Sequence, residues 1–386
     1  MTDRANDSRN SRSDSSSNSR SDSSSNSRSD SSSNSRSDSS SSSSPGKPLV
    51  TVITPCYNGE RFIEQWAQNL MSQDYPNVEV IFVNDGSADN TAAAFIAAEE
   101  QLHRRDYIVR YVEKANGGAA DAVNTALKLV NGAYIMLLDM DDFLFPEAIS
   151  AKADFLTEHE DIDFVMNDGY VVREQNLDDR STLLEEGAYR LNKHQFDDFL
   201  NMRAITYPGS YMVRSGALFA RLKDRSIYIS PYGQNFQMLM PVACFGKGGY
   251  IDKPLMKYVH YAASASHTRS FERRVELHDG YEGNAVGTIM YLDIPQSEKD
   301  KYIETIKKAS LEGRFTIGIE YRKHELIKDQ YIKMAEQGLI TKRIRWLYIL
   351  TRIPLGCFII STFSRMKRVR KRLLYRMKKS FFGKDL

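Results

Sequence analysis

Three aspartates follow an apolar run that predicts a buried strand. Residues 134–138 are apolar, and Asp139, Asp141 and Asp142 come next within four positions. Burying unpaired carboxylates is costly, so these side chains should emerge at the carboxyl end of the strand, where α/β sheets bind ligands. Two aspartates that flank one residue can hold Mg²⁺ or Mn²⁺ together with water and substrate phosphates. Taken alone, the stretch is explained equally well by a solvated acidic turn that caps a helix starting near Pro146.

Two other polar loops follow predicted strands, at residues 54–58 and 84–87. The carboxyl ends of parallel strands meet at one edge of a sheet, so these loops should converge with the aspartates at a nucleotide-like site. The sequence contains neither a G-x-G-x-x-G motif nor a P-loop. A dinucleotide fingerprint and a kinase-type phosphate cradle are therefore excluded, and bound phosphates would need a metal.

The elements that must position these loops alternate between β-rich and amphipathic stretches. Such alternation predicts βαβ units and a mostly parallel sheet flanked by helices, that is, an α/β fold. The predicted strands are 49–54, 78–83, 107–112 and the run that ends in Asp139, and the predicted helices are 60–71, 90–103 and 118–130.

Four motifs in this order resemble the family 2 inverting glycosyltransferases with the GT-A fold, of the capsule or exopolysaccharide type. They read Val-Thr-Val-Ile-Thr-Pro-Cys-Tyr-Asn-Gly-Glu, Val-Asn-Asp-Gly-Ser-Ala-Asp-Asn-Thr, Asn-Gly-Gly with Asn-Thr-Ala-Leu, and Leu-Asp-Met-Asp-Asp. Each motif is weak alone, but four with these spacings are specific. The resemblance is strong over about residues 48–150 and weaker to about 268.

The resemblance implies a role for each matching residue. Asp141 would hold a Mn²⁺ or Mg²⁺ ion that bridges the donor diphosphate, and Asp139 would contact the ribose or the same metal. His260 or His267 could complete the metal shell or touch the pyrophosphate. Val123 stands where many relatives carry Arg, so one donor contact is missing or supplied differently. The residues implied to bind the nucleotide donor are Thr54, Pro55, Tyr57, Asp85, Asn116, Gly118, Asp121 and Asp139.

The general base is the point where this sequence departs from the family. Where relatives carry a Glu-Asp pair, this chain has Gln234 and Asn235, whose amides cannot take up a proton near neutral pH. We expect these two residues to position the acceptor at the catalytic centre. Asp168, placed at the end of a strand over 163–167, His260 or His267 could replace the base, although Asp168 equally suits a turn. An acceptor oxygen that is already ionised would need no base.

Charge is distributed unevenly along the 386 residues. The net charge is +2, but residues 342–386 carry +13, residues 1–44 are neutral, and residues 45–341 carry about −11. This asymmetry predicts that the tail alone meets a polyanion. Three widely spaced cysteines predict neither disulfides nor a zinc site, which fits a reducing compartment, and the polar N-terminus predicts no signal peptide.

Four segments are predicted. Residues 1–44 contain a Ser-Arg-Ser-Asp-Ser-Ser-Ser-Asn repeat without apolar side chains, which predicts a disordered segment outside the catalytic machinery. Residues 45–270 would form the GT-A-like nucleotide-binding domain, and 271–341 a helical C-terminal extension. Residues 342–386 would form a basic amphipathic tail that associates with a membrane.

The tail combines an apolar stripe with basic flanks. Trp346, Ile349, Leu350 and Ile353 recur at helical spacing, and the longest uncharged run, 353–364, has twelve residues. A spanning helix needs about 20 apolar residues. The pattern is typical of a helix in an anionic membrane interface. The alternative is that the stripe packs on the protein's own acidic body; nucleic-acid binding is less favoured.

Together these observations predict a metal-dependent inverting glycosyltransferase. It would move a sugar from a nucleotide-sugar, with a preference for UDP-sugars, to a lipid-linked or growing glycan in cell-surface polysaccharide synthesis. Its expected place is the cytoplasmic face of the cell membrane, as a peripheral protein. The alternative is a catalytically weak partner subunit that binds nucleotide or a companion glycosyltransferase, which Gln234, Asn235 and Val123 favour. A sugar-nucleotidyltransferase is disfavoured because no triphosphate loop follows the first strand.

Overall fold

The computed structural model describes residues 46–180, 182, 195–204, 206–261, 270–363 and 366. The octad repeat, His267 and residues 367–386 of the basic tail lie outside the described residues. From Lys47 onward, the described residues belong to one compact unit.

The first four strands form a parallel sheet, as the alternation of strands and helices predicts. Strand β1 is central, with β2 and then β3 on one side and β4 on the other. The strands are β1 (Val50–Cys56), β2 (Val78–Asn84), β3 (Ile108–Glu113) and β4 (Tyr134–Leu137), and the connecting helices are α1 (Ile63–Met71), α2 (Thr91–His103) and α3 (Ala119–Leu127). A 3-10 turn, Glu60–Phe62, opens the first predicted helix.

Four later strands extend this sheet into a mixed eight-stranded one, with the order β3-β2-β1-β4-β7-β6-β8-β5. Strand β7 runs antiparallel to both β4 and β6, while β6 and β8 are parallel. The added strands are β5 (Phe143–Leu144), β6 (Phe164–Arg173), β7 (Tyr211–Arg214) and β8 (Gly248–His260), with helices α4 (Ala148–Glu158), α5 (Phe196–Leu200), α6 (Ser215–Phe219) and α7 (Asn235–Phe245) between them.

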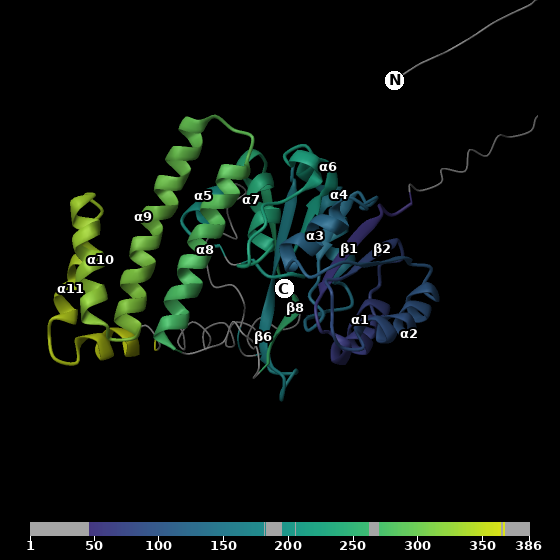
Figure 1. Ribbon diagram of the computed structural model, residues 1–386, viewed down its shortest axis with the longest axis horizontal. Helices are drawn as coiled ribbons and strands as arrows, with labels where there is room; N and C mark the ends of the chain where they lie inside the picture. The colour runs from purple at the N-terminus through teal and green to yellow at the C-terminus, as the bar shows by residue number, and fades with distance from the viewer. Residues whose placement is uncertain are drawn as a thin grey trace, which may run out of the picture. The chain divides into compact units, whose positions relative to one another are not determined.

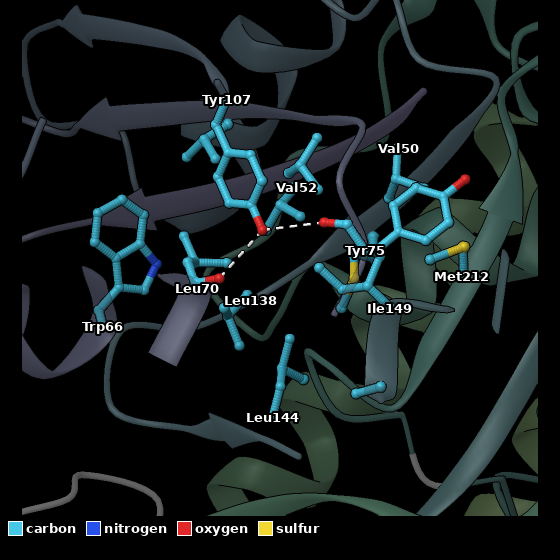
Figure 2. Packing of buried hydrophobic residues seen from close by; sticks show 14 of the residues in the cluster. Val50, Val52, Trp66, Leu70, Tyr75, Tyr107, Leu138, Leu144, Ile149 and Met212 are labelled. Carbon is cyan, nitrogen blue, oxygen red and sulfur yellow. Dashed lines mark hydrogen bonds between the residues drawn. The ribbon is translucent and has the colours of Figure 1, made fainter. Parts of the chain in front are cut away.

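Alternating side chains of β1 supply apolar clusters on the two faces of the sheet. Val50 and Val52 belong to one cluster, and Ile53 belongs to the other. Figure 2 shows the first cluster, in which the Tyr107 hydroxyl lies 3.3 Å from the Leu70 carbonyl oxygen and 3.2 Å from that of Tyr75. Burial on both faces explains why the parallel strands read as nearly continuous apolar runs.

Helical structure follows the sheet, and among the described residues four long helices lie beside one another in Figure 1. They are α8 (Phe271–Tyr291), α9 (Gln296–Glu320), α10 (His324–Glu336) and α11 (Lys342–Thr351). α8 contacts α7, and each later helix contacts the one before it. A separate apolar cluster that includes Phe315, Ile327 and Ile344 joins the last three helices. The fold is therefore an α/β sheet domain with a helical C-terminal extension, as predicted.

The face of α11 that packs on the body is not the predicted apolar stripe. Ile344 is buried and Tyr348 packs against the cluster, whereas Trp346 is 66% exposed. Ile349 and Ile353 are also exposed. For the described residues, the alternative in which this stripe docks on the body is therefore wrong.

Pro354 lies in a break of the tail helix, since α11 ends at Thr351 and helical structure resumes at residues 356–363. No described helix combines the length and the apolar character needed to cross a membrane.

Lys152 of α4 is a fully buried lysine whose two hydrogen-bond acceptors are neutral. Its Nζ donates to Asn167 Oδ1 and to the Gly209 carbonyl oxygen, both at 3.2 Å. Burial lowers the pKa of Lys152 from its ordinary value of 10.5 to about 7. Because the unfolded chain binds the extra proton between these two values, the free energy of unfolding should rise with pH from about 7 to about 10.

Replacing this lysine should therefore remove a pH dependence of stability. In Lys152→Met, we expect the rise in the free energy of unfolding across this window to become smaller by a few kcal/mol. Urea unfolding at pH 7 and at pH 9.5 measures the difference, with the exposed Lys301→Met as the matched control. An equal pH slope in the wild type and in Lys152→Met would contradict the assignment.

Candidate functional site

The acidic cluster lies at the carboxyl end of β4. The backbone N–H of Leu138 donates to the Ile53 carbonyl oxygen at 3.0 Å, which holds the chain against β1 up to the first aspartate. Asp139, Asp141 and Asp142 then place one carboxylate oxygen each within 4.8 Å of the others. Among the described residues, this is the one group of three acidic, histidine or cysteine side chains with such spacing.

The carboxylates do not cap the next helix, so the alternative of an acidic helix cap is wrong. α4 begins at Ala148, and its N-cap residue is Glu147. The cluster instead turns back on itself, since the Asp142 N–H donates to the Asp139 carbonyl oxygen at 3.3 Å. Asp142 thus joins the two aspartates that the sequence predicts as metal ligands.

Crowding and burial make this cluster electrostatically unfavourable when it holds no cation. Burial, and then the charge of Asp141, raise the pKa of Asp139 to about 7. Burial also raises the pKa of Asp142 well above its ordinary value, with the charges of Asp141 and Asp139 adding to the effect. Asp142 Oδ1 accepts a hydrogen bond from the Val259 N–H at 3.1 Å, but its buried Oδ2 has no protein partner.

These features fit a divalent cation. Hard cations such as Mg²⁺ and Mn²⁺ prefer carboxylate oxygens. Positive charge among Asp139, Asp141 and Asp142 would offset their mutual repulsion, and the orphaned Asp142 oxygen offers a further ligand atom. His260, predicted to complete the metal shell, is not in the group of close ligand atoms. It follows Val259 at the end of β8 and packs edge-on against Tyr258.

Asp85 organises the loop that follows β3. Its Oδ1 accepts the Gly117 N–H at 3.0 Å, and its Oδ2 accepts the Gly118 N–H at 2.7 Å. The Lys114 ammonium lies 2.7 Å from Asp85 Oδ1 and 2.6 Å from a carboxylate oxygen of Asp121. The nearly buried Asp85 carboxylate therefore holds Gly118 directly and Asp121 through Lys114, and both are among the predicted donor-binding residues. Lys114 is not predicted from the sequence, because a single lysine after a strand carries no motif.

The Asn-Asp-Gly turn after β2 is shaped to approach that loop. The side chain of Asn116 donates to the Asp85 carbonyl oxygen at 2.9 Å. Gly86 has φ +69°, and a Cβ atom there would lie 2.7 Å from the Asn116 nitrogen. Glycine is therefore required at this position by both backbone conformation and space.

The three predicted residues at the end of β1 differ in accessibility. The Thr54 hydroxyl is buried and accepts a hydrogen bond from Trp66 Nε1 at 3.1 Å. Pro55 is half-buried, whereas Tyr57 is 57% exposed. Of the three, Tyr57 thus offers the most surface for stacking against a ligand. Val123 is fully buried in the apolar cluster on the α3 face of the sheet. This position therefore supplies no counterpart to the arginine that many relatives carry there.

Gln234 and Asn235 stand at the start of α7, and the first of them reaches the acidic cluster. Gln234 Nε2 lies 3.4 Å from Asp139 Oδ1, within reach of a weak hydrogen bond. Asn235 Oδ1 accepts a hydrogen bond from the Tyr211 hydroxyl at 2.9 Å, which leaves its NH₂ group as the donor available to a ligand. The buried Tyr211 is another residue that the sequence does not single out.

The helical extension braces this turn. Asn284 of α8 donates from Nδ2 to the Tyr232 carbonyl oxygen at 3.0 Å and lies 3.1 Å from Gln237 Oε1. Gln237 in turn donates to the Gly233 carbonyl oxygen at 2.5 Å. The conformation of residues 232–237 therefore depends on α8 as well as on the sheet domain.

Asp168 lies within a strand, and the predictions of a strand end at 167 or of a turn are wrong. β6 continues to Arg173, and its pairing with β8 shifts register on both sides of Asp168. The side chain is nearly buried, and its Oδ1 accepts the N–H of Gly169 at 2.8 Å. Such bulges occur often beside active sites, where they redirect a side chain.

Comparison with known proteins finds similarity to one family over part of the chain. Residues 51–225 match the model described as "Glycosyl transferase family 2". An uncharacterized glycosyltransferase of Rickettsia felis is 31% identical over 166 residues, which make up 43% of this chain and 27% of the relative. The uncharacterized glycosyltransferase EpsJ of Bacillus subtilis is 39% identical over 97 residues, 25% of this chain and 27% of the relative. The matches span from 18% to 59% of the length of the Rickettsia relatives.

A solved structure agrees over a longer part of the chain. Residues 1–349 of S. aureus TarS, solved in complex with UDP-GlcNAc, cover 79% of this chain and 87% of their own with a TM-score of 0.52. The sequence identity is 19%, so this similarity concerns the fold.

Proposed function

Since residues 51–225 belong to glycosyl transferase family 2, we propose that the protein transfers a sugar from a UDP-sugar to a lipid-linked or growing glycan of the cell surface. The observation that carries the proposal is the cluster of Asp139, Asp141 and Asp142, with its orphaned buried oxygen, at the carboxyl end of β4, where α/β sheets bind ligands. Nucleotide-sugar transfer needs positive charge at the diphosphate, and this cluster of carboxylates is suited to hold a divalent cation that would supply it.

The chemistry assigns distinct tasks to the two sides of the site. The bond between the anomeric carbon and the diphosphate breaks, the carbon bonds to an acceptor oxygen, and that oxygen loses its proton to a base. A bound Mn²⁺ or Mg²⁺ ion would offset the charge that develops on the departing diphosphate. Asp85 and Lys114 would hold the loop on the donor side, and Gln234 and Asn235 would orient the acceptor by hydrogen bonds.

Calorimetry with the purified full-length protein tests the donor site. We expect UDP to bind in the presence of Mn²⁺ and to bind much more weakly in its absence. Transfer from UDP-sugars to lipid-linked acceptors is then the direct assay. Failure of UDP to bind in either condition would exclude a UDP-sugar donor.

The proton acceptor is expected to lie outside the Gln234-Asn235 pair. Replacing the base lowers transfer by about 10²- to 10⁴-fold and removes its ionisation from the pH profile of the rate. We expect this outcome for one variant among Asp168→Asn, His260→Ala and His267→Ala. Asn235→Ala should lower the rate while the shape of the profile stays the same.

Rate profiles between pH 5 and 9 distinguish these variants. A profile that changes shape in Asn235→Ala, and in none of the other three, would reject this division of roles. If all four variants keep the wild-type profile, the acceptor oxygen reacts without a protein base.

A second function is suggested by the amides at Gln234 and Asn235 and by the buried Val123. A partner subunit would bind nucleotide and assist a companion glycosyltransferase without turning over substrate. Under this alternative, the purified protein binds UDP but transfers no sugar from any UDP-sugar until the companion is added. Under the proposed function, the protein is active alone.

We also propose that the protein works as a peripheral protein on the cytoplasmic face of an anionic membrane. Residues 367–386 contain nine Lys or Arg residues and one acidic residue, Asp385. Each such cation near an anionic surface contributes about 1 kcal/mol. Deleting 367–386 should therefore move the protein from the membrane fraction to the soluble one.

The deletion spares α11, whose Ile344 belongs to the buried cluster. Sedimentation with anionic vesicles is the measurement, and an unchanged UDP affinity is the control for folding. If the shortened protein still sediments like the full chain, the basic segment does not direct it to membranes.

A further inference from the structure

A cavity of about 600 Å³ lies among the C-terminal helices and shares no residue with the acidic cluster. It forms where the turn between α9 and α10 meets the turn that follows α11. Arg322, Lys328 and Arg352 line it, with Glu325 as the one acidic lining residue. With His324 neutral, the lining carries a net charge of +2.

The contacts made by Arg322 and Arg352 leave the charge of both guanidinium groups available. The Arg322 guanidinium lies over the Phe358 ring, 5.5 Å from its centroid, and Arg352 Nη1 donates to the Tyr348 hydroxyl at 3.3 Å. Both partners are uncharged. α10 begins at this cavity, and no described side chain caps its first turn, so the backbone N–H groups there add positive partial charge. Guanidinium groups and free N–H groups together suit a phosphate.

The rim of the same cavity is apolar and faces water. Ile353, Leu355 and Phe358 line the cavity, and Leu355 exposes 74% of its surface. Leu355 also has φ +65°, a left-handed conformation that leucine rarely adopts. The turn after Pro354 therefore holds a large apolar side chain outward at a conformational cost.

The apolar rim continues along the chain on both sides of the turn. The exposed side chains are Trp346, Ile349, Ile353, Leu355, Phe358, Ile359, Phe363 and Met366. Contiguous exposed apolar surface usually marks an interaction site. A soluble phosphate in the cavity would leave all of this surface in water, whereas a lipid supplies both an anionic headgroup and acyl chains to cover it.

We propose that the cavity binds the phosphate headgroup of anionic membrane phospholipids while Leu355 and Phe358 insert among the acyl chains. The inference rests on the proposed peripheral location and extends it. It assigns the headgroup contact to Arg322 and Lys328, which lie outside the basic tail. The tail would then supply long-range attraction, and the cavity would fix how the protein sits on the bilayer.

Partition of the full-length protein into phosphatidylglycerol–phosphatidylcholine vesicles at physiological salt tests the proposal. Two cations near an anionic surface are expected to contribute about fivefold each, so the double variant Arg322→Ala/Lys328→Ala should bind roughly 25-fold more weakly. The matched control Lys307→Ala/Lys308→Ala removes the same charge from α9 and should stay within about twofold of the wild type. Leu355→Asn keeps a residue that tolerates the left-handed conformation, and it should also weaken binding.

Three results would overturn the proposal. Equal losses in the two double variants would mean that net charge alone drives binding. If the protein partitions equally into pure phosphatidylcholine vesicles and into vesicles that contain phosphatidylglycerol, the cavity does not recognise the anionic headgroup. Binding of inorganic phosphate by the soluble protein that competes with the vesicles, with no effect of Leu355→Asn, would assign the cavity to a soluble anion. UDP affinity, measured in parallel, shows whether the proposed function fails independently.

Discussion

Asp141→Ala is expected to abolish the Mn²⁺-dependent part of UDP binding while the fold stays intact. Asp141 offers one of the three carboxylate oxygens that lie within 4.8 Å of one another in the cluster and could hold a cation. A metal that stabilises a diphosphate supplies several kcal/mol, so losing it should weaken metal-dependent affinity by roughly 100-fold or more. Transfer activity should fall at least as far.

The same substitution should not destabilise the metal-free protein. The charge of Asp141 raises the pKa values of both Asp139 and Asp142, so it repels them in the folded state. Removing it relieves that repulsion, and the free energy of unfolding without metal should stay the same or increase. A variant that has lost UDP binding but not stability would separate a ligand role from a structural one.

Calorimetry with UDP, with and without Mn²⁺, and thermal unfolding without metal measure the two effects. Asp293→Ala, which removes an exposed carboxylate after α8, is the matched control. Unchanged Mn²⁺-dependent UDP affinity in Asp141→Ala would refute the metal site.

Asp85→Ala should damage both stability and nucleotide binding. The substitution leaves the N–H groups of Gly117 and Gly118 without their acceptor and removes one of the two carboxylates that hold Lys114. Breaking a buried charged network typically costs about 3–5 kcal/mol. Because Lys114 keeps Asp121 as a partner, we expect a loss near the lower end of that range, measurable by urea unfolding.

The effect on nucleotides separates two roles for Asp85. The family resemblance implies that Asp85 bonds the base, but in the structure both of its oxygens are engaged by residues of the 114–118 loop. If Asp85 acts by holding this loop, Asp85→Asn should weaken UDP and CDP binding by similar factors. A loss confined to UDP would instead support direct contact with uracil. Lys114→Met, which keeps the carboxylate, shows how much of the effect comes from the ion pair.

The sheet and the acidic cluster could be predicted because their signals are local. Buried parallel strands are mostly apolar, and each ends at a polar motif, so β1, β2 and β4 are recognisable in isolation. The junction at Asp139 combines both signals. Asp142 could not be assigned with equal ease, because its place in the cluster depends on the turn that brings it back toward Asp139 and on the Val259 N–H.

Other features depend on contacts that sequence patterns do not encode. Polar residues around Asp168 interrupt the apolar pattern of β6, so the strand appears to end where it only shifts register. Lys152 is buried although lysine is rarely found inside proteins. α11 has apolar residues on two faces, and periodicity cannot show that Ile344, not Trp346, meets α10.

The hydrogen bonds from Asn284 of α8 to residues 232–237 bear on which parts of the site can be exchanged between proteins. The family match ends at residue 225, whereas Gln234, Asn235 and the supporting Asn284 all lie beyond it. A chimaera that received only residues 51–225 from this protein would inherit the proposed donor side of the site and keep its host's counterpart of the proposed acceptor side. Donor and acceptor preferences should therefore be exchangeable separately, with the crossover point between β7 and α7.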